Sequence, residues 1–399
     1  MRLLSLVALA GAVCLAVPVA GYGVPPPPRI TLPGEAAGEQ RSYWLAPYVF
    51  VTEMNVGRSR TATVRWMAED GKVVREITGP QGGIEPGFVL ERRPGGDVVH
   101  PVNGSWAIDL KEKPGPSGYV TSNEDGSTFV QEFHPKTGEI AADVYRDGKH
   151  LATVGPYLDY LGWDAHVGAS GSLGLLIWKD QQQSIPKIVG VGADGRERFH
   201  ADCDGPVYAP DPNPDGTGVL VQSNGGKHAD AFAYYDKSGK VSQLDLGHNA
   251  RLVGWVPGTE QALIETSIGY VFRLHLIDWR QGRQIWEAPD PSPARVSWGA
   301  AAPIAVDEKY VLVGGLEYVR WDNQQEPVRR IDALDTKTGR TIATWHPVPL
   351  YQGASDVGRF LRLGKRLYLL TDSAFAEVDL NAIESRAKGW KSQDTPESR

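Results

Sequence analysis

Asp211, Asn213 and Asp215 come closest to the pattern of a metal site. Their side-chain oxygens alternate along the chain, and Gly216 follows where such a loop turns sharply. Loops of this pattern wrap a hard cation such as calcium with oxygen ligands. The acidic twelfth position is missing, because Gln222 stands there. We therefore predict a structural turn, keep the three residues as candidate calcium ligands, and expect folding not to need calcium.

The other residues that carry chemistry form no catalytic pattern. The nine histidines are scattered, without a pair three or four residues apart as in metal sites. Ser170 lies in a Gly-Ala-Ser-Gly-Ser run that lacks the G-x-S-x-G pattern of hydrolase nucleophiles, so we predict a flexible turn there. Cys203 is expected to be a buried thiol rather than a nucleophile. No catalytic residue and no cofactor are predicted.

The elements that must position these residues are short strands joined by tight turns. A phrase of Asp, a few residues, Gly and an apolar strand recurs at residues 236–241, 278–285 and 335–342. Self-similarity at roughly 40 to 50 residues, punctuated by hairpin turns, is typical of four-stranded blades. No long amphipathic helix pattern occurs, which disfavours an α/β enzyme. We predict an all-β protein, a β-propeller of about seven four-stranded blades.

The two ends of the repeat fit this scheme least well. We place the first two blades at Tyr48–Thr78 and Trp106–Val154, and the last at Phe360–Val378, which is short of strands. A strand from the start of the chain would complete the last blade and remove open sheet edges. The alternative is a separate β-sandwich at Tyr43–Phe133, followed by a smaller propeller.

The most suggestive set of side chains is eight tryptophans that recur across the last five predicted blades: Trp163, Trp178, Trp255, Trp279, Trp286, Trp298, Trp321 and Trp345. Large rings on loops serve as ligand platforms, but in a propeller they also pack between neighbouring blades. We predict that Trp286, which ends a repeat, packs between blades. Trp279 falls inside a predicted hairpin turn, and we predict that it is exposed.

Composition and the chain ends suggest export. Residues 1–21 have a positive start, an apolar run and small residues near Ala20, as in a signal peptide. We expect a Pro-rich extended linker at residues 22–42, the propeller at 43–383 and a polar flexible tail at 384–399. The net charge of -7 argues against nucleic acid or an anionic membrane bound by bulk charge. We expect a secreted or periplasmic protein with no transmembrane segment after signal removal.

Several motifs resemble repeats of known propeller families. Leu276–Trp286 and Ala333–Trp345 resemble the repeat of pyrroloquinoline-quinone-type propellers, and Asn213–Thr217 resembles that of periplasmic Tol-type propellers. Ser122–Phe129 resembles the Asp-box hairpin of sialidase-like propellers, with Glu at an Asp position. These resemblances imply an extracytoplasmic propeller. They do not imply the quinone, because Cys203 alone cannot form the adjacent-cysteine disulfide frequent in those proteins.

We expect a binding or scaffold module for a protein or an extracellular glycan, acting at one mouth of the propeller channel. The alternative is a hydrolase or lyase on an extracellular polymer, with carboxylates that converge on the channel. An enzyme should gather two or more ionisable side chains around the axis, whereas a binder should present an aromatic or apolar patch. The sequence favours the non-enzymatic hypothesis without deciding between them.

Overall fold

The computed structural model describes residues 39–383, apart from short internal segments of which the longest are 111–119, 224–230, 290–295, 298–303 and 346–357. The predicted signal peptide, most of the linker and the tail lie outside the described residues. In the described part, the strands pair antiparallel into eight sheets that follow one another along the chain. No helix there is long and apolar enough to cross a membrane. The protein is therefore an all-β propeller.

The first four blades each contain four strands in chain order. Blade 1 contains β1 (Glu39–Ala46), β2 (Val49–Val56), β3 (Ser59–Met67) and β4 (Val73–Pro80). Blade 2 contains β5 (Ile84–Glu85), β6 (Phe88–Glu91), β7 (Val98–Pro101) and β8 (Ile108–Asp109). Blade 3 contains β9 (Val120–Ser122), β10 (Thr128–Phe133), β11 (Glu139–Arg146) and β12 (Lys149–Leu158). Blade 4 contains β13 (Gly162–Val167), β14 (Leu173–Trp178), β15 (Lys187–Val191) and β16 (Glu197–Asp202).

The last four blades vary more in strand number. Blade 5 contains β17 (Val207–Pro212), β18 (Gly218–Ser223), β19 (Ala231–Asp236) and β20 (Gly239–Asp245). Blade 6 contains β21 (Arg251–Trp255), β22 (Gln261–Ile268), β23 (Val271–Asp278) and β24 (Arg283–Pro289). Blade 7 contains β25 (Val296–Ser297), β26 (Ile304–Val306), β27 (Tyr310–Trp321), β28 (Gln324–Asp335) and β29 (Thr341–Trp345). Blade 8 has, in the described chain, β30 (Arg359–Leu363), β31 (Arg366–Leu370) and β32 (Phe375–Val378).

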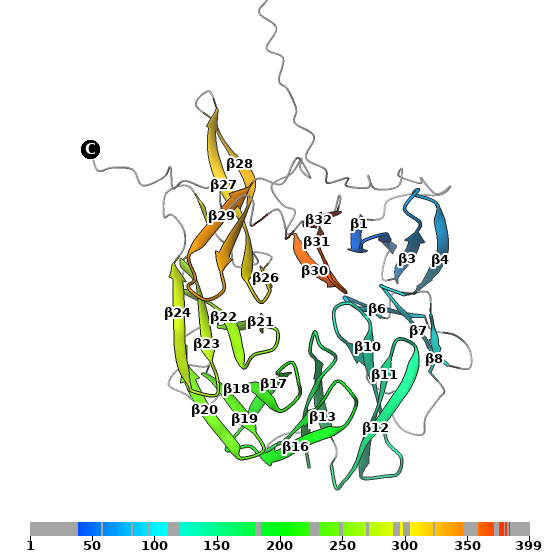
Figure 1. The fold of residues 1–399 in the computed structure, drawn as a ribbon. Coiled ribbons are helices and arrows are strands. Elements are labelled where there is room, and N and C mark those ends of the chain that lie inside the picture. The colour runs from blue at the N-terminus through cyan, green and yellow to red at the C-terminus, as the bar shows by residue number, and fades with distance from the viewer. Residues whose placement is uncertain are drawn as a thin grey trace, which may run out of the picture.

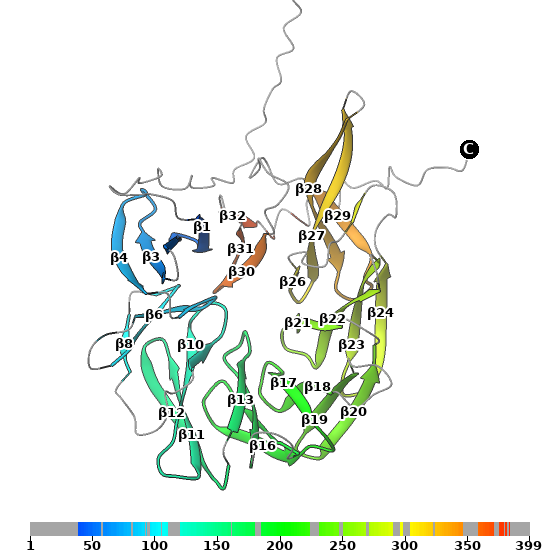
Figure 2. The same ribbon diagram turned by 180° about the vertical axis from the view of Figure 1, so that it is seen from behind.

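The blades are arranged in a ring with their first strands innermost (Figures 1 and 2). First strands of neighbouring blades contact one another, as β13 does with β9 and β17, and in blade 7 the second strand, β26, contacts β21 and β30. Last strands such as β20 and β24 lie at the periphery (Figure 1). Residues on first strands, and on the turns that follow them, are therefore the ones nearest the axis.

The ring has eight blades, not the seven that the sequence predicts. Blade 2, at Ile84–Asp109, is the one that the sequence analysis misses. Its first and last strands have two residues each, which is too short for an alternating apolar pattern to be recognised. Its Pro- and Gly-rich sequence therefore gives the signal of a loop.

The structure also corrects the predicted start of the ring. β1 pairs with β2 inside blade 1, so this strand does not complete blade 8. The first 90 ordered residues form blades 1 and 2 and the start of blade 3, and the β-sandwich alternative is wrong. β1 begins at Glu39, slightly before the predicted boundary at residue 43.

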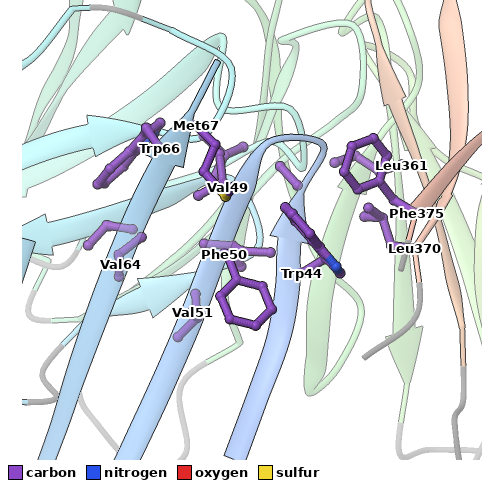
Figure 3. Packing of buried hydrophobic residues seen from close by; sticks show 14 of the residues in the cluster. Trp44, Val49, Phe50, Val51, Val64, Trp66, Met67, Leu361, Leu370 and Phe375 are labelled. Atoms are coloured by element: carbon purple, nitrogen blue, oxygen red, sulfur yellow. The ribbon is translucent and has the colours of Figure 1, made fainter. Parts of the chain in front are cut away.

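Side-chain packing closes the ring between blades 8 and 1. Trp44 of β1 packs edge-on against Phe375 of β32, with ring centroids 4.9 Å apart, and against Phe50 at 5.0 Å. Leu361 and Leu370 of blade 8 belong to the same buried cluster, and Figure 3 shows them beside Trp44. Within the described residues, blades 8 and 1 are joined by this aromatic core, and no strand pairs with both.

The rest of the core consists of separate apolar clusters between successive blades. One cluster joins Phe88 of blade 2 to Phe129 of blade 3, and others join each following pair around to blades 7 and 8. A blade that is apolar on both faces must bury both, and stacking against a neighbouring blade on each side achieves this. Each blade is therefore stabilised mainly by its two neighbours.

Two motifs that look different in sequence form the same turn between a first and a second strand. In blade 3, the side-chain Oδ1 of Asn123 accepts the backbone N–H of Thr128, and Asp125 Oδ1 accepts that of Ser127. In blade 5, Asn213 Oδ1 accepts the N–H of Gly218 in the same way. The Asp-box-like and calcium-like motifs are thus two copies of one turn stabilised by an asparagine.

We predict that Gly126→Ala lowers the free energy of unfolding by about 2 to 4 kcal/mol. Gly126 has a φ of 68°, and an added Cβ would lie 2.0 Å from the backbone oxygen of Gly87 in blade 2. The matched control is Gly239→Ala, where φ is 98° but nothing lies within 4 Å of the added Cβ. That control should cost only about 1 to 2 kcal/mol. Urea denaturation checks this, and equal losses would contradict the close approach of blades 2 and 3.

Candidate functional site

Four ionisable side chains from four blades lie in the inner part of the ring, and Glu124 is linked electrostatically to the other three. Glu124 lies on the turn between β9 and β10, His166 on β13, Asp211 on β17 and Arg359 at the start of β30. The charges of the other three residues each affect the pKa of Glu124. We call these four residues the axial cluster.

The location of the cluster follows from which blades contribute to it. Blade 3, which carries Glu124, is not a neighbour of blade 5, which carries Asp211, or of blade 8, which carries Arg359. Blades that are not neighbours approach one another only where their first strands converge (Figures 1 and 2). Asp211 and Arg359 lie on first strands and Glu124 on the turn after one, so all three lie in the inner part of the ring, where the charges of Asp211 and Arg359 affect the pKa of Glu124.

A β-bulge positions Asp211. The register of β17 against β18 shifts between Tyr208 and Asp211, and Ala209 has a φ of 52°. Such a conformation is costly for a residue other than glycine and marks sites where a side chain is redirected. Gly174 of β14 makes room for it, since an added Cβ would lie 2.5 Å from the Pro210 oxygen.

His166 and Asp211 form an ion pair between blades 4 and 5. His166 Nδ1 lies 2.8 Å from Asp211 Oδ2, and the two side chains are 47% and 20% exposed. The charge of Asp211 raises the pKa of His166, with smaller support from Asp164 and Glu124, while burial opposes it. The histidine is thus in contact with water yet surrounded by carboxylates, which favours its protonated form.

Glu124 and Arg359 are the remaining charged pair of the cluster. Burial raises the pKa of Glu124, and the positive charges of Arg359 and His166 oppose this rise. Burial lowers the pKa of Arg359, and the charge of Glu124 opposes that fall. The guanidinium donates a hydrogen bond to the backbone oxygen of Leu45 in blade 1. The Arg359 side chain is partly buried while that of Glu124 is exposed to solvent, and each charged form is favoured by the opposite charge of the other.

The predicted calcium ligands do not converge in the structure. Asp211 pairs with His166, while Asn213 is buried and donates through Nδ2 to the Tyr234 hydroxyl. Asp215 accepts the N–H of Thr217 inside the turn. Among the described residues, no group of three or more His, Cys, Asp or Glu side chains is arranged to hold a metal ion. A requirement for calcium remains untested.

The two tryptophan predictions have opposite outcomes. Trp286 packs between blades 6 and 7 as predicted. Its indole N–H donates a hydrogen bond to the backbone oxygen of Thr336 at 2.7 Å. The prediction that Trp279 is exposed is wrong, because its side chain is fully buried. Its ring lies beside Phe232 of blade 5, so the hairpin folds back onto the preceding blade.

The other candidates from the sequence have structural roles. Cys203 is a buried free thiol, and burial raises its pKa to about 12, which keeps it protonated. The Ser170 and Ser172 hydroxyls lie 3.0 Å apart in a turn. The Ser172 hydroxyl also donates a hydrogen bond to the backbone oxygen of Asn213 in blade 5. The sequence marks Asp211 as a candidate metal ligand rather than an ion-pair partner, and no motif marks His166 or Arg359. Only the folded ring brings them together.

A buried histidine, His100, lies between blades 1 and 2. His100 is completely buried, and its Nε2 lies 2.7 Å from Glu91 Oε2. Its Nδ1 faces the guanidinium of Arg75, which lies over the Trp66 ring. Since the guanidinium can only donate, Nδ1 must accept and Nε2–H must donate to Glu91. Burial, followed by the positive charges of Arg75 and Arg93, lowers the pKa of His100, and the Glu91 hydrogen bond opposes this.

We predict that His100 makes the protein sensitive to acid. Its pKa in the folded state is lowered, so its contribution to stability is present above the unfolded value of about 6.5 and is lost as the pH falls through the folded value. The free energy of unfolding of the wild type should therefore fall more steeply than that of His100→Gln between pH 7.5 and pH 5. Urea denaturation across this range measures it. Parallel pH profiles would contradict the neutral, buried histidine.

Comparisons with known proteins give no family for this chain. No protein-family model matches it, and no curated protein matches it. Similar solved structures include an uncharacterized protein from Listeria monocytogenes (8% identity, TM-score 0.40, covering 84% of this chain and 88% of that one). They also include the WD40 domain of Toxoplasma gondii coronin, with 9% identity and a TM-score of 0.36, covering 86% of this chain and 85% of that one. A third is BamB from Moraxella catarrhalis, with 14% identity and a TM-score of 0.28, covering 72% of this chain and 95% of that one. These likenesses are too distant to carry a functional argument.

Proposed function

We propose that this protein is an exported binding module that holds a protein partner at the axis of the ring. The observation that supports this most is the axial cluster, which joins Glu124, His166, Asp211 and Arg359 from four blades. The Asp211 and Arg359 side chains are partly buried, and partly desolvated charges interact more strongly with a partner than exposed ones do. A strained bulge positions one of them, which a merely structural ion pair does not require.

The chemistry of the cluster favours binding over hydrolysis. His166 is paired with Asp211 and its raised pKa favours the protonated form, so it is a poor general base. Cys203 is buried and protonated away from it, and Ser172 is held by the Asn213 oxygen. The cluster therefore supplies charge and hydrogen bonds but no activated nucleophile.

A first experiment combines capture with mapping of the contact. Immobilised wild type and the variants Asp211→Asn and Glu85→Gln are exposed to periplasmic or secreted proteins, and bound partners are quantified by mass spectrometry. Glu85 is an exposed carboxylate on β5 and serves as the control. The proposal expects a partner that is depleted about tenfold on Asp211→Asn only, and that protects residues 123–128 and β13 from hydrogen exchange. Protection confined to outer strands would contradict it.

Export has a separate test. We propose cleavage near Ala20, because the apolar run that precedes it is short and flanked by small residues. Intact-mass analysis of the exported protein should give a chain that begins near Tyr22. A mass that still includes residues 1–20 would contradict this part of the proposal.

One observation favours a second candidate, the hydrolase or lyase that acts on an extracellular polymer. Ionisable side chains do gather around the axis, as such an enzyme requires, and a raised pKa is what a carboxylic acid needs to donate a proton near neutral pH. In this case Glu124→Gln would abolish turnover of a polysaccharide without changing its binding. Absence of turnover by the wild type on a polysaccharide panel would leave the binding function alone.

A further inference from the structure

The turns that lead into the last strands of blades 5, 6 and 7 share one charge pattern. Each turn starts with an Asp and has a basic residue directly after its glycine and a second one between the two. Asp236, Asp278 and Asp335 each accept a backbone N–H inside their own turn through Oδ1. The basic residues outnumber them, and in chain order they are Lys237, Lys240, Arg280, Arg283, Lys337 and Arg340.

Four of these basic side chains are exposed and have no ion pair within the described residues. They are Lys237, Arg283, Lys337 and Arg340, and we call them the rim cations. The other two are paired, Lys240 with an aspartate of the same blade and Arg280 with a glutamate of its own blade. The rim cations therefore present positive charge to the solvent that no described carboxylate neutralises by contact.

Contacts between blades place the three turns in one row. An added Cβ at Gly282, in the blade 6 turn, would lie 3.0 Å from the Cβ of Ser242 on β20. An added Cβ at Gly339, in the blade 7 turn, would lie 2.7 Å from the Trp286 ring on β24. Each of these turns thus lies on the last strand of the preceding blade, and packed sheets are about 10 Å apart. The strands β20, β24 and β29 follow one another along one side of the ring (Figures 1 and 2).

The equivalent turns of blades 1, 3 and 4 carry no such excess of positive charge. In blade 1, Lys72 pairs with Asp70 at 3.0 Å, and in blade 4, Arg198 pairs with Asp194 at 2.9 Å. The blade 3 turn has one residue of each sign. Since the whole chain has a net charge of -7, the row on blades 5 to 7 is a local basic strip on an acidic protein, which favours a negatively charged ligand there.

The uncharged side chains around the rim cations indicate which kind of anion fits. The exposed large apolar side chains of the described chain all lie in blades 1, 3 and 4, so the described parts of blades 5 to 7 expose none. Protein interfaces are centred on apolar or aromatic anchors, and single-stranded nucleic acids stack on aromatic rings. The row instead exposes hydroxyl and amide groups between its cations, those of Ser238, Gln281, Gln284 and Thr338.

We propose that the rim cations bind an anionic polysaccharide along the outer edge of blades 5 to 7. The acidic groups of the polymer pair with the lysine and arginine side chains, and its hydroxyl groups exchange hydrogen bonds with the neighbouring amides and hydroxyls. A polymer with a charge on every repeating unit meets the three turns at once, which raises its affinity above that of any single contact. This surface is separate from the axial cluster, so the inference adds a second partner and does not depend on the proposed function.

The test measures binding of the full chain by fluorescence anisotropy. The labelled probes are oligogalacturonate, with one carboxylate per sugar, and dextran sulfate, which together show whether carboxylate or sulfate is preferred. The better of the two should bind about tenfold more tightly than poly-L-glutamate with the same number of charges, because its hydroxyl groups add hydrogen bonds. Raising the ionic strength from about 0.05 to about 0.5 M should weaken binding, since the cations are exposed. The row variant, Lys237→Gln with Arg283→Gln and Arg340→Gln, should bind about tenfold more weakly.

A control variant with the same loss of charge separates the row from the effect of net charge. Lys72→Gln, Lys149→Gln and Arg196→Gln together remove three exposed cations from the equivalent turns of blades 1, 3 and 4. This variant should bind the polysaccharide like the wild type. Asp211→Asn should also bind it unchanged, because Asp211 lies in the axial cluster, so the inference and the proposed function can fail separately.

Three results would overturn the inference. The first is equal weakening in the row and control variants, because net charge alone would then explain the binding. The second is tighter binding of poly-L-glutamate or duplex DNA than of either polysaccharide, and the third is no binding of either polysaccharide. Thermal unfolding of each variant shows whether the ring is intact. If the row variant unfolds, the single change Lys337→Gln on an exposed side chain should still weaken binding about twofold.

Discussion

Replacing Trp279 with alanine should lower the free energy of unfolding by about 3 to 5 kcal/mol, as removal of a fully buried ring does elsewhere. The side chain is completely buried and lies beside Phe232, with ring centroids 6.1 Å apart. The loss arises because the hairpin of blade 6 is held against blade 5. Urea denaturation gives the value directly.

The neighbouring residue provides the control for this measurement. Arg280 lies in the same turn and forms an ion pair with Glu260, and its side chain is 64% exposed. Arg280→Ala should therefore cost less than about 1 kcal/mol. Trp286→Ala should cost as much as Trp279→Ala, because Trp286 is buried against blade 7. A small loss at Trp279 would mean that its ring is exposed after all.

Replacing Phe375 with alanine should cost a similar amount, about 3 to 5 kcal/mol. Phe375 of blade 8 packs against Trp44 and against Tyr48, at 4.9 and 5.1 Å between ring centroids. Since this aromatic core closes the ring, its loss should also speed unfolding. Phe375→Leu keeps most of the volume and should cost less than about 1.5 kcal/mol.

A small loss would contradict this role of Phe375. If Phe375→Ala cost no more than an average substitution, about 1 kcal/mol, the ring of Phe375 would not be packed between blades 8 and 1. Urea denaturation at equilibrium, followed by unfolding kinetics, measures both effects.

The all-β propeller could be predicted because its signal is local. Hairpin turns such as the one that ends at Gly239 need a positive φ, and glycine at these positions marks the blades in the sequence. Blade 2 escaped the prediction because the strands Ile84–Glu85 and Ile108–Asp109 are too short to alternate. The predicted number of blades is therefore too low because blade 2 has the weakest sequence pattern.

The site could not be predicted because its residues are brought together only by the closed ring. Glu124 and Asp211 belong to turn and strand motifs that the sequence does show, but Arg359 lies in blade 8 with no motif of its own. The burial of Trp279 likewise depends on the folded ring. Its turn was predicted, but whether a turn residue faces solvent or the preceding blade depends on a tertiary contact.

The most direct test of the axial cluster is an NMR titration of the His166 side chain. The structure predicts a pKa above the ordinary value of about 6.5, because Asp211 and Glu124 favour the charged ring. Its contribution to stability is then present below about pH 6.5 and is lost as the pH rises through the folded value. Asp211→Asn should lower this pKa most, and Glu124→Gln should lower it by a smaller amount. An ordinary pKa that neither variant changes would show that the blades do not bring these charges together and would contradict the proposed site.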